Sequence, residues 1–382
     1  MSIQVLLPKF RTEECLAEIK ECLDNGWTGI GFKTEMFEKQ WCEYTKLPYA
    51  HFLNSNTVGL HLAIHLFKKH YNWQDDDEVI STPLTFISTN HAIMYENLRP
   101  VFADVDETLC LDPSSIESRI TDRTRAVMYV GLGGNTGKLD LVSDLCKKYN
   151  LKLILDAAHM AGTYYKKKHV GSEADVAVFS FQAVKNLPTA DSGMICFKDS
   201  FFDLAARKLS WLGINKDTYA RAHTQGRYKW QYEVEDLGFK YHGNSIMAAL
   251  GLVGLRYLDM DNDYRRMLVK QYETLLSHIP GIFLIEKAKD CVSSQHLFQI
   301  GVSNRDRVLE YLYKNDIYPG VHYRDNTEYE MYRYALHTCP RAQKISRNII
   351  SLPLHLHMTN QDVSHVCEVI KHAVMSIETL HE

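Results

Sequence analysis

The segment "ADVAVFSFQAVKNLPTADSG", residues 174–193, decides how the chain folds. Its first part, residues 174–181, is apolar except at Asp175 and Ser180, and such a run is typical of a β-strand that is buried on both faces. Lys185 follows where the chain leaves this predicted strand. A surface lysine does not need a buried strand beside it, whereas a nucleophilic lysine gains from burial, because burial favours the neutral amine. We therefore interpret Lys185 as a candidate catalytic residue.

Short apolar runs alternate with helical patterns on both sides of this segment, up to about residue 200. Continuous apolar strands separated by helices are typical of a mainly parallel sheet that helices cover on both faces. The spacings leave room for the crossovers that parallel strands need, so the sequence predicts an α/β fold. The predicted strands are 50–53, 78–82, 100–106, 125–130, 151–156 and 175–181, and the main predicted helices are 55–70, 86–96 and 139–150.

The pattern changes after residue 240. Apolar positions in residues 245–279 recur at steps of three and four, which predicts one or two long helices. Two later runs, "HLFQIGV" and "IISLPL", predict strands of a smaller α+β unit. We therefore expect a large domain, residues 1–255, with a mainly parallel mixed sheet between helices, and a small C-terminal α+β domain, residues 256–382.

The composition argues against several classes of protein. The 382 residues carry a formal net charge of -4 and only one short basic run, "YYKKKHV", so the basic face of a nucleic-acid-binding protein is missing. The nine cysteines form no C-x-x-C pair, which argues against a zinc ribbon or a disulfide framework and for a reducing compartment. We predict no metal site. No apolar run approaches the ~20 residues that span a bilayer, and no signal-peptide pattern is present, so we expect a cytoplasmic protein without membrane contact.

Polar and aromatic side chains follow several of the predicted strands. In open α/β sheets a ligand binds beyond the carboxyl ends of the strands, so these residues can meet at one rim. Taken singly, each has an ordinary structural explanation, such as a surface position for Lys185, a helix N-cap for Asp156 or a core position for His159. The rim residues are Asn56, Thr57, Phe86, Asp156, His159, Ser180 and Lys185.

Together these residues suit one cofactor, pyridoxal phosphate. Its phosphate needs the N–H groups of a helix N-terminus, which residues 55–58 offer, and Ser180 adds a hydroxyl. Its pyridine nitrogen needs a carboxylate, which Asp156 supplies, so that the ring acts as an electron sink. Its aldehyde needs a lysine amine, which Lys185 supplies, and Phe86 can stack on the ring.

The order of the motifs resembles that of the sugar aminotransferases of the DegT/DnrJ/StrS type, which have the fold type I of aspartate aminotransferase and use pyridoxal phosphate. The strongest match is "LDAAHMAGTYYKKKHVGSEADVAVFSFQAVKNLPTADSGMICF". "NGWTGIGFKTEMFEKQW", "LNSNTVGLHLAI", "TPLTFISTNHAIMYENLRPVFADVD", "DLGFKYHGNSIMAALGL", "PGVHYRDN" and "IISLPLHLHMT" resemble the other blocks of the family, so the resemblance runs nearly from end to end.

The resemblance implies that Lys185 forms the Schiff base with the cofactor and that Asp156 pairs with the pyridine nitrogen. The other residues expected to bind the cofactor are Asn56, Thr57, Phe86, His159, Ser180 and Lys240, of which Lys240 belongs to a segment that reaches the neighbouring subunit in this family. On the substrate side we expect Trp27, Thr28, His322 and Tyr323.

The sequence departs from the family pattern at several positions. Asn56 stands where glycine is usual, Lys240 where asparagine is usual, and Gln182 where histidine is common. "HGN" replaces "R-M-T", and "ADSG" replaces "G-E-G-G". These departures put contacts to the phosphate in doubt, but the lysine, the aspartate and the phosphate loop are all present.

The family implies a homodimer with shared active sites that moves an amino group from L-glutamate to a keto-sugar, most often linked to a nucleotide, in amino-sugar biosynthesis. Some relatives carry histidine at the lysine position and act as sugar dehydratases, so Lys185 favours transamination. A lyase of the same fold and a non-catalytic sensor that binds the cofactor remain alternatives. The identity of the sugar, the aminated carbon and the pathway (lipopolysaccharide, glycan or antibiotic) cannot be predicted from the sequence.

Overall fold

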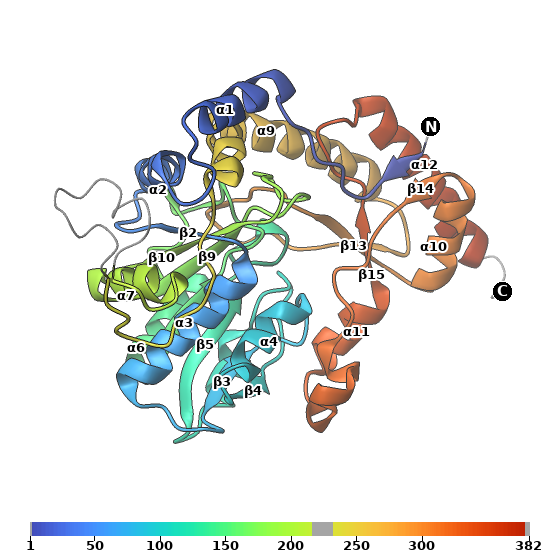
Figure 1. Ribbon diagram of the computed structural model, residues 1–382. Coiled ribbons are helices and arrows are strands. Elements are labelled where there is room, and N and C mark those ends of the chain that lie inside the picture. The colour runs from blue at the N-terminus through green and yellow to red at the C-terminus, as the bar shows by residue number, and fades with distance from the viewer. Residues whose placement is uncertain (1, 216–231, 379–382) are drawn as a thin grey trace.

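The computed structural model describes residues 2–215 and 232–378, and its centre is a seven-stranded sheet (Figure 1). All neighbouring strands are parallel except in the two pairs that contain β10. The predicted mainly parallel mixed sheet is therefore confirmed. The strands lie in the order β2 (His51–Leu53), β10 (Gly193–Phe197), β9 (Val176–Ser180), β6 (Lys152–Asp156), β5 (Thr124–Val130), β3 (Glu78–Ser81) and β4 (Arg99–Phe102).

The side chains of β9 explain why this sheet is covered on both faces. Ala177 and Phe179 belong to the apolar core on one face, and Val176 and Val178 belong to the core on the other. Successive side chains of a strand point to opposite faces, so a run without polar residues needs cover on both sides. The unbroken apolar run in the sequence thus corresponds to a strand at the centre of the molecule.

Helices form the two outer layers (Figure 1). One face is covered by α2 (Phe32–Thr45), α6 (Leu139–Lys148) and the first part of α9 (Ser245–Leu276). The other face is covered by α3 (Asn56–Tyr71), α4 (Ile87–Met94) and α7 (Ser200–Ser210). Farther out, α1 (Thr12–Asp24) packs on α9, and the short α5 (Pro113–Glu117) packs on α6.

The C-terminal part of the chain has its own sheet and core. Three antiparallel strands, β11 (Ile282–Leu284), β13 (Phe298–Val302) and β15 (Ile349–Leu352), pack with the end of α9 and with α10 (Arg305–Lys314) and α12 (Asn360–Glu378). The helix α9 continues without a break across residue 255, and β1 (Ile3–Gln4) pairs with β14 (Ile317–Tyr318). The division of the chain into domains 1–255 and 256–382 stays a prediction.

The remaining elements connect these layers. The basic run "YYKKKHV" forms a hairpin of β7 (Tyr164–Tyr165) and β8 (Lys168–His169), and β12 (Cys291–Val292) pairs with it. The short helices are η1 (Leu132–Gly134), η2 (Asn326–Glu328), η3 (Glu330–Ala335) and α11 (Pro340–Asn348). None of the helices in residues 2–215 and 232–378 combines the length and the apolar character that a membrane span requires.

Gly193 allows the start of α3 to approach the sheet closely. It is the first residue of β10 and pairs with Leu53 and Ser180. A Cβ atom at Gly193 would lie 2.7 Å from the backbone nitrogen of Asn56 and 2.8 Å from the carbonyl oxygen of Phe179. Because both are backbone atoms, a side chain at this position has to displace either the helix or the strand.

We predict that Gly193→Ala lowers the free energy of unfolding by about 1–3 kcal/mol, the usual cost of overpacking a tight contact. Gly29→Ala is the matched control, because a Cβ atom there would meet nothing within 4 Å. Urea unfolding of both variants checks the prediction. Equal midpoints and slopes for the two variants would contradict it.

Candidate active site

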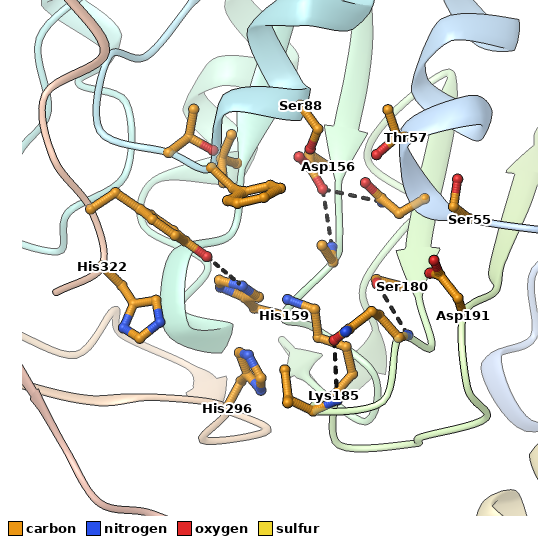
Figure 2. A pocket seen from close by; sticks show the side chains of 18 of the residues that line it. Ser55, Thr57, Ser88, Asp156, His159, Ser180, Lys185, Asp191, His296 and His322 are labelled. Atoms are coloured by element: carbon orange, nitrogen blue, oxygen red, sulfur yellow. Dashed lines mark hydrogen bonds between the residues drawn. The ribbon is translucent and has the colours of Figure 1, made fainter. Parts of the chain in front are cut away.

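A cavity of about 480 Å³ lies at the carboxyl ends of the parallel strands (Figure 2). Ser180 is the last residue of β9, Asp156 is the last of β6 and Val130 is the last of β5, and all three line it. Residues that were predicted to meet at the carboxyl edge of the sheet therefore line one cavity. Its predicted members that line the cavity are Asn56, Thr57, Phe86, Asp156, His159, Ser180, Lys185, His322 and Tyr323.

Asp156 lies at the floor of the cavity and is only 4% exposed. The chain turns after it instead of starting a helix, so Asp156 is not a helix N-cap. Its carboxylate accepts hydrogen bonds from Thr89 Oγ1 at 2.8 Å, from the Ala158 N–H at 3.1 Å and from Asn56 Nδ2 at 3.3 Å. Burial raises the pKa of Asp156, and these hydrogen bonds oppose the rise. Within residues 2–215 and 232–378 this carboxylate has no ion-pair partner, so it can take a cationic N–H from a ligand.

Lys185 extends into the same cavity from the turn after β9 (Figure 2). Burial lowers the pKa of Lys185 to about 8, and the negative charge of Asp156 limits this drop. A lysine with this pKa has a substantial neutral fraction near neutral pH, and the neutral amine is the form that attacks a carbonyl. Because Lys185 follows a buried strand, its amine is buried and its pKa is lowered, which is the effect of burial that the sequence suggested.

The first turn of α3 borders the opposite side of the cavity (Figure 2). Ser55 is the N-cap, and its Oγ accepts a hydrogen bond from the Val58 N–H at 3.3 Å. The N-terminus of this 16-residue helix attracts an anion, and the hydroxyl groups of Thr57 and Ser180 line the cavity nearby. We expected Asn56 to bind the cofactor. Its side-chain amide instead donates to Asp156 at 3.3 Å and to the Val178 carbonyl at 2.9 Å.

His159 lies between Asp156 and the C-terminal part of the chain and is fixed in one tautomer. The Gly133 N–H donates to His159 Nδ1 at 3.1 Å, so a neutral ring carries its proton on Nε2. That nitrogen lies 3.3 Å from Tyr323 Oη. Burial lowers the pKa of His159 well below its ordinary value, with smaller contributions from positive groups nearby, so the ring is neutral. His159 can therefore offer a fixed N–H to a ligand or to Tyr323.

His296 is a cavity residue that the sequence analysis missed. The amide nitrogen of Asn186 donates to Asn262 Oδ1 at 2.7 Å and to the Ser294 carbonyl at 2.8 Å. The Asn186 oxygen must then accept from His296 Nδ1, at 2.9 Å. The rings of His296 and His159 lie 4.3 Å apart. A histidine at the start of the predicted strand "HLFQIGV" was the available signal, but only the fold brings it to Lys185.

The C-terminal part also contributes His322 and Tyr323. His322 Nδ1 bonds Ser351 Oγ at 2.8 Å, and burial lowers the pKa of His322 to about 4. The ring of Tyr323 lies 6.0 Å from that of Phe86, which is 57% exposed. Burial raises the pKa of Tyr323. His322 and Tyr323 both line the cavity, and their role on the substrate side stays a prediction.

Three predicted site residues lie outside the cavity of this chain. Lys240 Nζ lies over the ring of Trp211 at 3.3 Å from its centroid. Trp27 precedes α2, and the carbonyl of the exposed Thr28 accepts a hydrogen bond from the Ser245 N–H at 3.1 Å. A single chain thus does not bring these residues to Lys185. The sequence analysis also missed Thr89 and Asp191, and Asp191 lines the cavity close to Ser180.

These features fit pyridoxal phosphate. The cavity combines an amine whose pKa is about 8, a buried carboxylate that forms no ion pair with the residues the structure describes, and the start of a long helix. The first group can bind the aldehyde, the second the pyridine nitrogen and the third the phosphate. On a mainly parallel sheet, this combination defines a pyridoxal-phosphate enzyme of the α/β class.

Comparison with known proteins gives the family. Residues 10–371 match the DegT/DnrJ/EryC1/StrS aminotransferase family, and the chain belongs to it. The spore coat polysaccharide biosynthesis protein SpsC of Bacillus subtilis is 33% identical, over 96% of each chain. The match confirms the predicted family and the predicted enzyme class, a sugar aminotransferase that uses pyridoxal phosphate.

Solved structures agree with this assignment. PseC of Helicobacter pylori, an aminotransferase involved in the biosynthesis of pseudoaminic acid, superposes with a TM-score of 0.90 at 26% identity, over 98% of this chain and all of that chain. The sugar aminotransferase Spr1654 of Streptococcus pneumoniae, whose function is described as putative, superposes in its PMP form with a TM-score of 0.89 at 27% identity, over 98% of this chain and all of that chain. These similarities confirm the fold class.

The pKa of Lys185 leads to a prediction for the cofactor-free protein. We expect the rate of capture of pyridoxal phosphate to rise with pH around a midpoint near 8, because the ammonium form cannot attack the aldehyde. Asp156→Asn should shift this midpoint downward, because the charge of Asp156 raises the pKa of Lys185. Stopped-flow absorbance at a series of pH values measures both midpoints. Nα-acetyl-lysine, with an amine pKa of about 10.4, is the control, and a protein midpoint equal to that of the control would disprove the prediction.

Proposed function

We propose that this enzyme transfers the amino group of L-glutamate to the keto carbon of a sugar that is linked to a nucleotide. The observation that supports the proposal most is that Lys185, Asp156 and the start of α3 meet in one cavity. The roles of PseC and SpsC, in pseudoaminic acid and spore coat polysaccharide biosynthesis, support a sugar as the acceptor. The free thiols of all nine cysteines support a location in the cytoplasm.

In this proposal Lys185 holds the cofactor and later moves the proton. When bound, the cofactor supplies an electron sink for the carbanion that proton removal leaves on the donor. Lys185 Nζ would hold the cofactor in the resting enzyme and, when free, would accept the proton of the donor α-carbon and later release it. A pKa of about 8 suits this task, because the same nitrogen must both accept and release a proton.

Asp156 and its neighbours hold the cofactor ring in place. Asp156 would bind the protonated pyridine nitrogen, and the hydrogen bonds from Thr89 and Asn56 fix the direction of its carboxylate. Phe86 would stack on the ring. His159 would present its Nε2–H at the cavity, because Gly133 occupies its other nitrogen.

The phosphate would bind at the start of α3, with Thr57 and Ser180. Asp191 is a carboxylate that also lines the cavity, and burial raises the pKa of Asp191. We further propose that the enzyme is a homodimer in which Lys240 completes the phosphate site of the partner subunit. Its place over Trp211, outside this chain's own cavity, supports a role in trans.

His322 and Tyr323 would face the sugar. Burial keeps His322 neutral, with a pKa of about 4, so it would recognise hydroxyl groups rather than a phosphate charge. Trp27 and Thr28 would contribute from the partner subunit, since they lie outside the cavity of their own chain.

The first test is the visible absorption spectrum of the enzyme with pyridoxal phosphate, before and after addition of L-glutamate. We expect a band of lysine-bound cofactor that L-glutamate converts to the amine form. Lys185→Ala should lose the band and lower turnover by about 10²–10⁴-fold or more, the usual contribution of a general acid–base group. A band that L-glutamate leaves unchanged would instead favour the lyase or the sensor.

Asp156→Asn separates the role of the carboxylate from cofactor binding. We expect the variant to retain the cofactor but to lose activity on the order of 10²-fold, because the stabilisation of charge in the ring weakens. Single-turnover kinetics with L-glutamate measures the loss, and circular dichroism checks the fold. Unchanged kinetics would show that Asp156 does not contact the pyridine nitrogen.

A further inference from the structure

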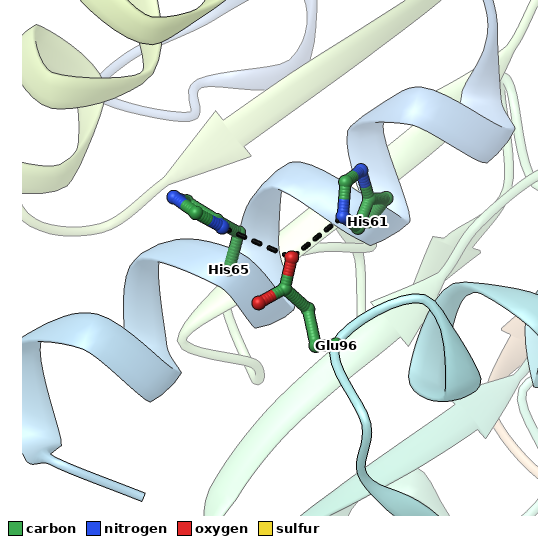
Figure 3. A group of neighbouring side chains, drawn as sticks. All are labelled: His61, His65 and Glu96. Atoms are coloured by element: carbon green, nitrogen blue, oxygen red, sulfur yellow. Dashed lines mark hydrogen bonds and ion pairs between the residues drawn. The ribbon is translucent and has the colours of Figure 1, made fainter. Parts of the chain in front are cut away.

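Two histidines and a glutamate meet on the face of α3 that is turned to α4. His61 and His65 belong to the stretch "HLAIH" and lie one helical turn apart, so both side chains project from the same side of the helix. Glu96 approaches them from the turn after α4, and Figure 3 shows the three side chains directed at one another. We refer to His61, His65 and Glu96 as the His–His–Glu cluster. It does not line the active-site cavity.

The atoms of this cluster have the spacing of metal ligands. His61 Nε2 lies 2.7 Å and His65 Nδ1 lies 3.0 Å from the same oxygen, Glu96 Oε1. All three atoms lie within 4.8 Å of one another. In the part of the chain that the structure describes, no other three His, Cys, Asp or Glu side chains meet this criterion. The ligand atoms of a tetrahedral zinc ion lie about 3.3 Å apart, given bonds of about 2.0–2.1 Å, so Glu96 Oε1 would have to move away from both nitrogens to admit the ion.

The surroundings hold the two imidazoles in place. The ring of His61 packs edge-on against Phe239 at 5.1 Å and Tyr95 at 5.6 Å, and the ring of His65 packs against Phe239 at 5.2 Å. Aromatic rings on several sides restrict the rotamers of a ligand, which reduces the entropy lost when an ion binds. His61 is buried, and His65 and Glu96 are partly exposed, so a solvent molecule can complete a coordination sphere.

Tyr241 supplies the outer hydrogen bond that metal-binding histidines usually make. Its hydroxyl lies 3.0 Å from His61 Nδ1, the nitrogen that does not face Glu96. A hydroxyl can accept as well as donate, so it can satisfy His61 with the proton on Nδ1 and Nε2 free for an ion. Lys68 does not compete for the carboxylate, because Lys68 Nζ donates to the backbone carbonyl of Glu96 and to Asp75.

We propose that the His–His–Glu cluster binds a divalent transition-metal ion, preferentially Zn²⁺, through His61 Nε2, His65 Nδ1 and Glu96 Oε1, with water as a fourth ligand. Two imidazole nitrogens and one carboxylate oxygen are a ligand set that zinc accepts, whereas Mg²⁺ and Ca²⁺ prefer oxygen alone. Each neutral ring keeps its single proton, on Nδ1 of His61 and on Nε2 of His65, when the other nitrogen binds the ion.

The ion would join α3 and the turn after α4, two elements that begin at the active site, and Tyr241 would support it from a third segment. Thr57, in the first turn of α3, precedes His61 by one helical turn on the same side of the helix. Phe86 is the N-cap of α4, after which Glu96 follows, and Tyr241 adjoins Lys240. An ion bound here would stabilise the arrangement of these segments from outside the cavity, so we assign it a structural role and no part in the chemistry.

A metal titration of the pyridoxal-phosphate-loaded enzyme tests the proposal. The enzyme is treated with a chelator and then dialysed against Zn²⁺, and bound zinc is measured by elemental analysis before and after the dialysis. We expect the dialysis to add one equivalent of zinc per chain. Cobalt titration gives a second readout, because Co²⁺ accepts the same nitrogen and oxygen ligands and its visible absorption reports its coordination geometry. Zinc should also raise the midpoint of thermal unfolding.

Variants assign the bound ion to the cluster. His65→Asn and Glu96→Gln should weaken zinc binding by more than about 100-fold, and Tyr241→Phe by about 10–100-fold, the usual effect of losing an outer hydrogen bond. His70→Asn, which alters an exposed histidine of the same helix, is the control and should bind zinc like the wild type. Two results would overturn the proposal. If the wild-type enzyme binds no zinc, the cluster is only a group of three hydrogen-bonded side chains. If His65→Asn and Glu96→Gln bind zinc as well as the wild type does, the ion binds elsewhere. The glutamate-dependent spectrum is recorded in parallel, so a failure of the proposed reaction is distinguishable from a failure of the metal site.

Discussion

Burial of two opposite ionisable groups in one cavity is the constraint on which this structure depends. Asp156 and Lys185 both lie where low polarity disfavours their charged forms, and each moderates the pKa of the other. Neither group is neutralised by a direct ion pair among the described residues, so the pair is poised for a ligand with a basic ring nitrogen and an aldehyde. The sheet makes this possible, because parallel strands β6 and β9 deliver both groups to the same edge.

The helix α3 is the second determinant of the site. Its first turn has to lie against β10, and Gly193 permits that approach because any Cβ would meet backbone atoms. Its N-terminus then faces the cavity, while its later turns present His61 and His65 to Glu96. One helix therefore serves an anion site at its start and the His–His–Glu cluster farther along, and the rigidity of the helix couples the two positions.

The C-terminal part of the chain completes the cavity. His296, His322 and Tyr323 arrive from loops around β13 and β14, far from Lys185 in the sequence. The Asn186 amide sets the tautomer of His296, and Asn186 directly follows Lys185. The two parts of the chain thus meet through hydrogen bonds as well as through apolar contacts.

The sequence by itself determined the mainly parallel sheet, its two layers of helices and the central lysine and aspartate. The reason is that the hydrophobic period of each segment, and the alternation of strands and helices along the chain, can be recognised locally. The carboxyl ends of parallel strands then share one edge of the sheet. The tertiary structure alone decided that Asp156 does not cap a helix, that the Asn56 amide faces Asp156, and that His296 enters the cavity while Lys240, Trp27 and Thr28 stay outside it. The contacts of Asn56 and of His296 join residues about a hundred positions apart in the sequence, and no local pattern specifies such contacts.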